Sequence, residues 1–246
     1  MTEQASASEA PLMEHLVELR KALVRVLLVA FVGFAICLYY SEDIYLMLAA
    51  PLMSILPEKS HFIATHPIEA WVTYLKTAFF CGLFFSSPFM FFSIWKFIAP
   101  GLKKSEKKWG VAFVASTSLC FVAGALFGYF EVFPYVFSFF LSIINPDNIV
   151  FLPQMDSYLS FVFKLILAFG LTFEIPVLMT LLSLSGIVTF KAMFSFQRYM
   201  IVSAFIVSAI LTPPDWVTQI LMALPIIALY QLGLLLAWIV GKKQSA

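Results

Sequence analysis

A glutamate lies near the middle of an apolar stretch that is long enough to cross a lipid bilayer. The stretch runs from Ser157 to Leu182, and a helix needs about 20 apolar residues to span the hydrocarbon core. Glu174 lies inside it, two residues before Pro176. A charge at the bilayer centre costs roughly 2.5–3.5 kcal/mol, so such a residue usually faces a partner, a cavity or a substrate path. We therefore predict a membrane protein with a polar working site inside the membrane.

The composition supports this class. Hydrophobic residues make up 62% of the chain and charged residues 12%, whereas a soluble domain is about half apolar and about a quarter charged. The net charge of +1 identifies no partner. We expect no cleavable signal peptide and no cofactor or metal, and we expect the three cysteines to be small buried apolar residues: Cys37, Cys81 and Cys120.

Six apolar segments predict six transmembrane helices: Ala22–Tyr40, Ala70–Ile94, Trp109–Phe140, Ser157–Leu182, Tyr199–Leu211 and Trp216–Val240. The fifth is too short for a core of about 30 Å, which predicts a locally thinner bilayer or polar flanks that dip into it. The third is long, and we expect it to tilt or to continue as a helix beyond the membrane through Pro134.

These segments predict an all-α, polytopic membrane protein with a concave helical bundle. Residues 1–246 form one integral membrane domain in this prediction. It comprises an amphipathic lead-in at residues 1–21, a six-helix bundle at residues 22–240 and a tail at residues 241–246.

The basic residues predict the orientation. Twelve of the 15 Lys and Arg residues fall before or just inside the start of the first segment, after the last, or in the two loops on the same side: Arg20, Lys21, Arg25, Lys96, Lys103, Lys104, Lys107, Lys108, Lys191, Arg198, Lys242 and Lys243. The opposite loops hold only Lys59. Because cytoplasmic loops are enriched in Lys and Arg, both termini are predicted to lie in the cytoplasm.

A charged run precedes the first segment. In a helix, Glu14, Glu18, Lys21 and Arg25 share one face. The run is interpreted either as a solvated helix start with local ion pairs or as an acidic site for a cationic ligand, because the two like charges one turn apart repel unless a cation is near.

A second charged run follows the helix-breaking pair Pro100-Gly101. Glu106 is the only acid among four lysines there. It either balances their charge or is a positioned carboxylate that faces the cytoplasm.

The Glu174 segment predicts a kink together with a carboxylate. Pro176 has no N–H, so the Thr172 carbonyl loses its helical partner. Lys164 lies about 15 Å away along the helix, so it cannot bond Glu174 and is expected to snorkel outward. A purely structural bond between Glu174 and another helix is the alternative.

Polar residues also mark the turn before the sixth segment. Asp215 is expected to cap that helix. Gln219, one turn later, either satisfies a neighbouring backbone group or bonds a partner helix. Gly124 and Gly128 form a GxxxG pair, which more often indicates close internal packing than an oligomer contact.

Several of these runs occur together, in this order, in one family. The chain resembles the TatC family, the multi-spanning receptors of the twin-arginine protein translocase. The matching runs include His15–Arg20, Ala50–Leu52, Phe97–Pro100 with Glu106, Ser157–Phe161, Ala168–Pro176, and Leu211–Asp215 with Gln219. The resemblance covers Leu12 to about Trp238.

The resemblance implies a function and site residues. It implies a receptor in the bacterial inner membrane that binds paired-arginine signal peptides and, with TatA-like and TatB-like single-span partners and the proton-motive force, exports folded proteins. It also implies self-association within a larger complex, and no catalysis or nucleic-acid binding. The implied signal-peptide residues are Glu18, Arg20, Leu102, Lys104 and Glu106. Glu174 matches an intramembrane acid, and further sensitive positions match Pro51, Phe97, Asp215 and Gln219.

The chain departs from the family pattern at two positions. Ala22 stands where many members have a basic residue, which leaves Lys21 or Arg25 as the local cation. Ser105 stands where a histidine is common.

Two other functional classes fit this sequence less well than the TatC resemblance does. An ion-coupled solute transporter would need further polar residues facing Glu174, and the segments offer few. An intramembrane protease would need an Asp pair, a serine with His or Lys, or a metal site within the segments, and none is evident.

Overall fold

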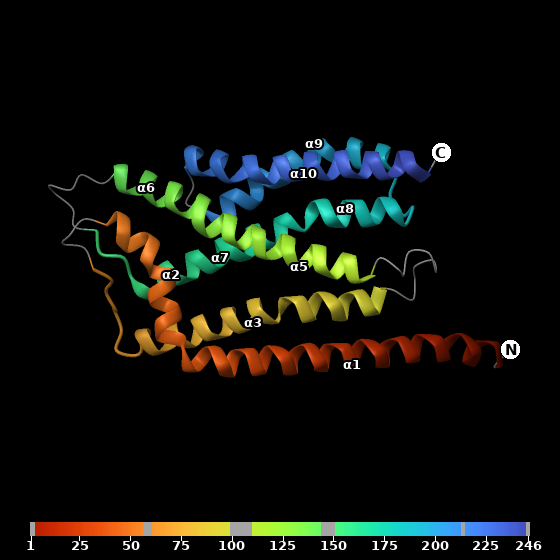
Figure 1. Ribbon diagram of the computed structural model, residues 1–246, viewed down its shortest axis with the longest axis horizontal. Helices are drawn as coiled ribbons and strands as arrows, with labels where there is room; N and C mark the ends of the chain where they lie inside the picture. Colours follow the sequence, from red (N-terminus) through yellow and green to blue (C-terminus); the bar gives the residue numbers. More distant parts are fainter. Residues whose placement is uncertain (1–2, 57–60, 99–109, 144–150, 213–214, 245–246) are drawn as a thin grey trace.

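The computed structural model describes residues 3–56, 61–98, 110–143, 151–212 and 215–244, with side chains for 17–56, 61–96, 110–143, 151–212 and 215–241. These residues are almost entirely helical (Figure 1). In chain order the elements are α1 Glu3–Tyr39, α2 Ser41–Ile55, α3 Glu69–Ile98, α5 Gly110–Phe127, the π-helical segment η2 Gly128–Val132, α6 Phe133–Ile143, α7 Met155–Phe173, α8 Ile175–Leu184, α9 Phe190–Leu211 and α10 Trp216–Gln244.

The prediction of an all-α protein with six membrane spans is confirmed. Six stretches of the described chain are long and apolar enough to cross a bilayer: Val17–Tyr39, Glu69–Lys96, Gly110–Ile143, Met155–Leu184, Phe190–Leu211 and Trp216–Gly241. The third continues as a helix through Pro134, as predicted, although five of its residues are π-helical.

The predicted length of the fifth span was wrong. The apolar run starts at Tyr199, but α9 begins at Phe190 and has 22 residues. Thr189 caps its first turn by accepting from the Ala192 N–H, and Lys191 and Arg198 lie within the helix. A helix of this length crosses the core unaided, so the argument for a locally thinned bilayer loses its basis.

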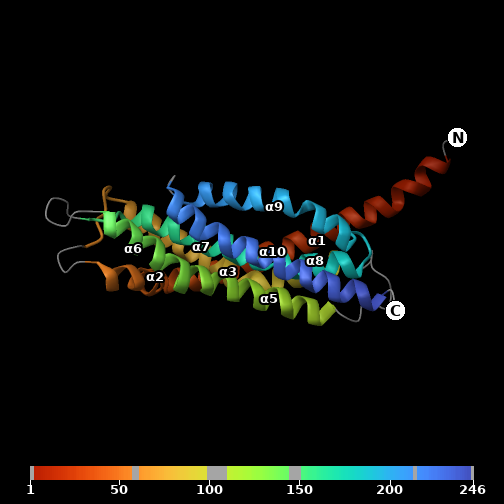
Figure 2. The same cartoon turned by 90° about the horizontal axis from the view of Figure 1, so that it is seen from above.

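The helices form an open row and do not close into a ring (Figure 1). α1 lies along one edge and packs chiefly on α3. The helices α5 and α7 cross in the middle of the row. The other edge is formed by α8, α10 and α9. Both termini lie at the same end of the row. Figure 2 shows the N-terminal half of α1 leaving the other helices.

The α1–α3 contact depends on two glycines. A Cβ placed on Gly82 would lie 2.4 Å from the Phe34 backbone nitrogen, and one on Gly33 would lie 2.8 Å from the Gly82 carbonyl oxygen. Close approach of backbones is how small residues hold helices together in lipid. Ser86 adds a hydroxyl bond to the Val29 carbonyl at 3.3 Å.

The largest core cluster joins α2, the α5–η2–α6 helix and α7. It is rich in aromatic residues, such as Phe133 and Phe169, each 1% exposed. The GxxxG pair is used for internal packing, because a Cβ on Gly124 would lie 2.4 Å from the Phe169 carbonyl oxygen, and one on Gly128 would lie 3.0 Å from Leu165.

Pro51 lies inside α2. Proline cannot donate to the carbonyl four residues earlier, here that of Met47. The Tyr129 hydroxyl, from η2, donates to this carbonyl at 2.8 Å. Beside it the Tyr158 hydroxyl donates to the Leu48 carbonyl at 2.7 Å. The carbonyl released by Pro51 is therefore satisfied from another element.

We expect Tyr129→Phe to lower the free energy of unfolding by about 1–3 kcal/mol, because the Met47 carbonyl loses its partner in an apolar setting. In a Pro51→Ala background the new N–H supplies a helical partner, so the same change should cost less, by about 1 kcal/mol. Thermal unfolding in detergent measures all four combinations.

Tyr158→Phe is the matched control for this cycle. Its acceptor, the Leu48 carbonyl, faces residue 52, which keeps its N–H in both backgrounds. Its cost should not change with Pro51→Ala. If Pro51→Ala reduced the cost of both Tyr→Phe substitutions equally, Tyr129 would not be the specific partner of the carbonyl that Pro51 releases.

Candidate functional site

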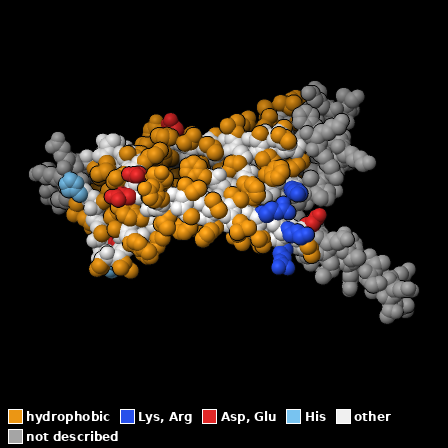
Figure 3. Space-filling model, turned by 60° about the horizontal axis from the view of Figure 1, so that its bottom comes forward, with side chains coloured by type: hydrophobic (Ala, Val, Ile, Leu, Met, Phe, Trp, Pro, Cys, Tyr) orange, Lys and Arg blue, Asp and Glu red, His pale blue; other side chains and the backbone are white. Residues whose placement is uncertain are grey.

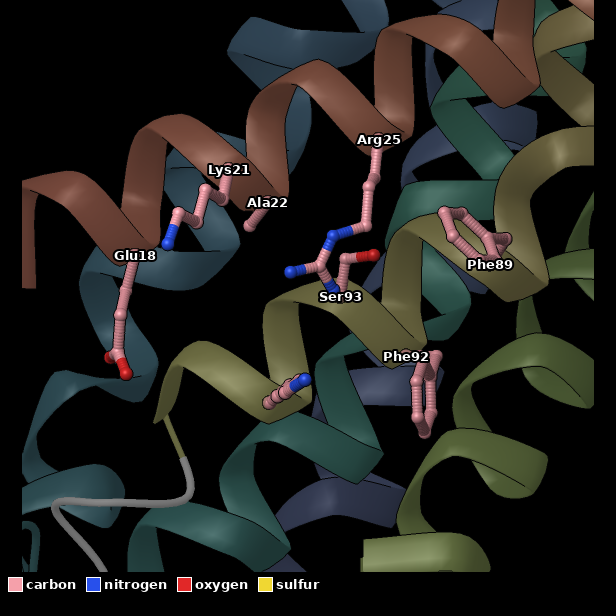
Figure 4. Close-up of a pocket in the computed structure, with 8 residues that line it drawn as sticks. Glu18, Lys21, Ala22, Arg25, Phe89, Phe92 and Ser93 are labelled. Carbon is pink, nitrogen blue, oxygen red and sulfur yellow. The ribbon is translucent and has the colours of Figure 1, made fainter.

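A pocket of about 460 Å³ opens between α1 and α3 at the end of the molecule that holds both termini (Figure 4). Four residues of each helix line it: Glu18, Lys21, Ala22 and Arg25 from α1, and Phe89, Phe92, Ser93 and Lys96 from α3. Both sets are spaced i, i+3, i+4 and i+7, which places each on a single helix face. Two antiparallel faces of the same periodicity therefore enclose the pocket.

The lining is strongly cationic. Its described residues include three basic side chains and one carboxylate. Within the described part of the chain, none of these four groups forms an ion pair or a hydrogen bond, since the one ion pair found there joins Lys76 to Asp156. Figure 3 shows Lys and Arg side chains gathered at this end, whereas the Asp and Glu side chains in view lie mostly toward the other end.

The structure places only some of the predicted signal-peptide residues. Glu18 lines the pocket, and Arg20 is exposed on α1 but does not line it. Leu102, Lys104 and Glu106 lie outside the described residues. The helices that flank them are described: α3 ends at Ile98 and α5 begins at Gly110, at the same end as the pocket. Phe97 belongs to α3, but its side chain is outside the described set.

Glu174 lies at the break between α7 and α8, as the proline predicts. α7 ends at Phe173, α8 begins at Ile175, and Glu174 is the residue between them. Its side chain is only 6% exposed, and its Oε1 has no hydrogen-bond partner among the described residues. Lys164 is exposed, which agrees with its expected snorkelling. The break therefore buries a carboxylate oxygen without a partner.

The predicted capping role of Asp215 is confirmed. Its Oδ1 accepts from the Thr218 N–H at 2.8 Å, and its Oδ2 accepts from the Thr218 hydroxyl. The Gln219 side chain donates to the Phe205 carbonyl of α9 at 3.1 Å. Of the two alternatives, the structure thus gives Gln219 a neighbouring backbone partner, and this bond ties α10 to α9.

The chain matches the family model described as Sec-independent protein translocase protein (TatC) over residues 14–225. It belongs to the TatC family. It is 41% identical over 237 residues to the Sec-independent protein translocase protein TatC of Magnetococcus marinus, which covers 96% of this chain and 87% of that protein. Against the TatC of Escherichia coli strain K12 the identity is 39% over 236 residues, with 96% and 91% covered.

A solved TatC structure confirms the fold. The crystal structure of the twin-arginine translocase receptor TatC superimposes with a TM-score of 0.82 at 34% identity and covers 92% of this chain and 99% of that one. Membership of the TatC family and six apolar helices make this chain a multi-pass membrane protein of a protein translocase. The family is one of translocase components, which argues against the solute transporter and the protease.

Sequence reasoning missed a polar network at the end opposite the pocket. Glu69 is 6% exposed, and its carboxylate accepts from the Thr65 N–H and hydroxyl at 2.6 and 2.8 Å, from the His66 N–H at 3.2 Å and from the Asp156 N–H at 3.3 Å. Lys76 pairs with Asp156 at 2.6 Å. The segments before α3 and α7 are also joined by the Ile63 N–H, which donates to the Pro153 carbonyl at 3.0 Å.

Glu69 and Glu174 are equally buried but differ in their hydrogen bonding. Glu69 accepts four hydrogen bonds, whereas one oxygen of Glu174 has no partner in the described chain. We expect Glu69→Ala to lower the free energy of unfolding by about 1–3 kcal/mol, because four donors are left unpaired. Glu174→Ala should leave stability unchanged or raise it, because it removes a buried group that lacks a partner.

Thermal unfolding of both purified variants in one detergent measures this difference. Each variant is the control for the other, since the two substitutions remove the same atoms at the same exposure. A loss in Glu174→Ala as large as that in Glu69→Ala would assign Glu174 a structural role.

Proposed function

We propose that this TatC-family chain is the signal-peptide receptor of a twin-arginine translocase. In this proposal it binds paired-arginine signal peptides of folded precursor proteins at the cytoplasmic face of the inner membrane. With small single-span partners it then moves the precursors across, driven by the proton-motive force. The twin-arginine receptor named among the solved relatives supports the proposal.

The observation that carries the proposal is the free carboxylate of Glu18. It is exposed, it lines a water-accessible pocket, and no cation of the described chain pairs with it. An arginine guanidinium offers five donors in a fixed fork that matches a carboxylate. Charge-assisted pairs of this kind gain strength where water is partly excluded, as it is at the headgroup level.

Glu106 is proposed as the second reader, with one arginine for each carboxylate. The ends of α3 and α5 lie at the same end of the molecule as Glu18, and residue 106 connects them in sequence. Arg20, Leu102 and Lys104 belong to the same proposed region. With Ala22 in place of a basic residue, Lys21 and Arg25 supply the local positive charge.

The finer features of the assembly are part of the proposal. Both termini lie in the cytoplasm, as the distribution of Lys and Arg indicates. The partners are TatA-like and TatB-like single-span proteins, and copies of this chain associate in a larger complex. The exposed apolar face of α9 supports helix docking there, with Val202, Ile206 and Ile210 more than half exposed. Pro51, Phe97, Asp215 and Gln219 support the helices around these contacts.

We expect Glu18→Gln and Glu106→Gln each to weaken binding of an Arg-Arg signal peptide about tenfold to a hundredfold, the cost of losing a charge-assisted hydrogen bond. A Lys-Lys peptide should lose far less, because an ammonium cannot use the bidentate geometry. Titration of labelled peptides against the purified protein in detergent measures both affinities.

The double variant distinguishes two arrangements. If each carboxylate binds its own arginine, the losses should add, and if both hold one guanidinium, the double variant should lose less than the sum. We expect additivity. Unchanged relative affinity for the two peptides in both single variants would refute the assignment.

Export should also depend on Glu174. We expect Glu174→Ala to insert normally and to lose transport of a twin-arginine precursor, because the break between α7 and α8 loses its buried acid. Export by membrane vesicles at matched protein levels measures the effect, with Glu131→Ala as a control that removes an exposed carboxylate of the η2 segment. Wild-type export by Glu174→Ala would limit this carboxylate to a structural role.

A further inference from the structure

We propose that the pocket between α1 and α3 binds the phosphate group of an anionic phospholipid. The ligand would be a lipid with a net negative headgroup, bound on the side of the bilayer where the termini lie. This inference does not rest on the peptide-binding proposal, since the phosphate would be held by the cations and a hydroxyl of the pocket, and the arginine of a peptide by its carboxylate.

The first argument is charge. Among the described residues, Lys21, Arg25 and Lys96 line one pocket together with one acid, Glu18, a surplus of two positive charges. Nothing in the described ranges neutralises these cations. Arg198, by contrast, bonds the Tyr199 hydroxyl at 3.1 Å and lies 4.8 Å from its ring centre. Like charges gathered in this way repel one another unless an anion lies between them.

The second argument is the polar group on the α3 side. Ser93 lines the pocket, and its hydroxyl forms no hydrogen bond within the described residues. The hydroxyl is therefore available to donate to a ligand in the pocket. In Figure 4 the Arg25 side chain extends from α1 toward Ser93. A phosphate oxygen between them would accept from both the guanidinium and the hydroxyl.

The third argument is space. Ala22 lies on the pocket wall between Lys21 and Arg25 and leaves room that a longer side chain would fill. A pocket of about 460 Å³ is ample for a phosphate and the adjoining glycerol.

The fourth argument selects a lipid over a free phosphate ion. The pocket lies where two membrane spans end, since Val17 begins the first span and Lys96 ends the second. It is therefore at headgroup depth. Phe89 and Phe92 line the pocket toward the apolar part of α3, where they would contact an acyl chain. An inorganic phosphate would leave both rings without a partner.

The lipid and the proposed signal peptide need not exclude each other. Glu18 and Arg25 are seven residues apart, about 10 Å along the helix, and Figure 4 shows their side chains well separated. A bound phosphate would offset the positive charge that otherwise repels an incoming arginine.

Native mass spectrometry of the full chain, released from detergent with added lipid, tests the proposal. The probes are phosphatidylglycerol and phosphatidylcholine with identical acyl chains, and the readout is the ratio of the two bound forms. We expect Arg25→Gln to lower this ratio about fivefold, the usual effect of one basic side chain near an anionic surface. Ala22→Leu should lower it without any change of charge, because it fills the pocket.

Lys191→Gln is the matched control, since Lys191 is an exposed cation near the same end of the molecule but outside the pocket. It should leave the ratio unchanged. Glu18→Gln should raise lipid binding while it weakens the Arg-Arg peptide, so the two proposals fail separately. Thermal unfolding of each variant checks that it is folded.

Three results would overturn the proposal. Equal losses for Arg25→Gln and Lys191→Gln would mean a general surface-charge effect. Displacement of phosphatidylglycerol by millimolar inorganic phosphate would mean a site for the free ion. A lower ratio of phosphatidylglycerol to phosphatidylcholine in Glu18→Gln would mean that the carboxylate helps to hold the lipid, which contradicts a site selected by positive charge.

Discussion

In hydrocarbon there is no water to bond a backbone carbonyl that has lost its helical partner, and each such group costs several kcal/mol. Prolines inside helices release such carbonyls. Pro51 lies in α2, outside the six spans but packed on the apolar core, and there the Tyr129 hydroxyl of another element donates to the Met47 carbonyl. At Pro176 the helix instead ends and restarts, with Glu174 at the junction.

The same constraint explains several of the hydroxyl side chains inside the spans. Thr77, Thr117, Thr172 and Ser208 donate to carbonyls three or four residues earlier in their own helices. Because these hydroxyls donate within their own helix, they have no proton left to donate to a neighbouring helix or a ligand. Glu174 Oε1 has no partner in the described chain, and neither have the buried hydroxyls of Thr73, Ser87 and Ser118. Glu174 differs from them because it is a carboxyl group, whose charged form costs far more to bury than a hydroxyl does. This cost is the physical reason to treat it as a working group.

Much of the fold could be predicted from hydropathy alone. The six spans, the break at Pro176 and the cap at Asp215 follow from local rules that need no knowledge of neighbours. The start of α9 could not, because Lys191 and Arg198 interrupt the apolar run although their helix continues. Hydropathy locates the apolar part of a helix, whereas the helix itself can begin several residues before it.

The candidate site was predicted only in part. Glu18 stands out in the sequence, since it repeats the charge of Glu14 one turn earlier. Ser93 and Lys96 carried no signal, because their role depends on how α3 lies against α1. The same holds for Glu69 and Asp156, which are 87 residues apart in the chain. Contacts between residues so far apart in the sequence depend on how the helices pack against one another. The hydrophobic periodicity of a single helix does not predict this packing.

The attachment of α1 has a consequence for which substitutions this helix can accept. α1 is held along one seam, where Gly33 and Gly82 meet, and most of its remaining circumference faces outward, including Phe31, Val32 and Ile36. In lipid, one large apolar side chain is nearly as good as another, so these positions can drift freely in evolution while they stay apolar. The two glycines have no such freedom, because any side chain would push the backbones apart. The sequence requirements of this helix contact are thus strictest at its smallest residues.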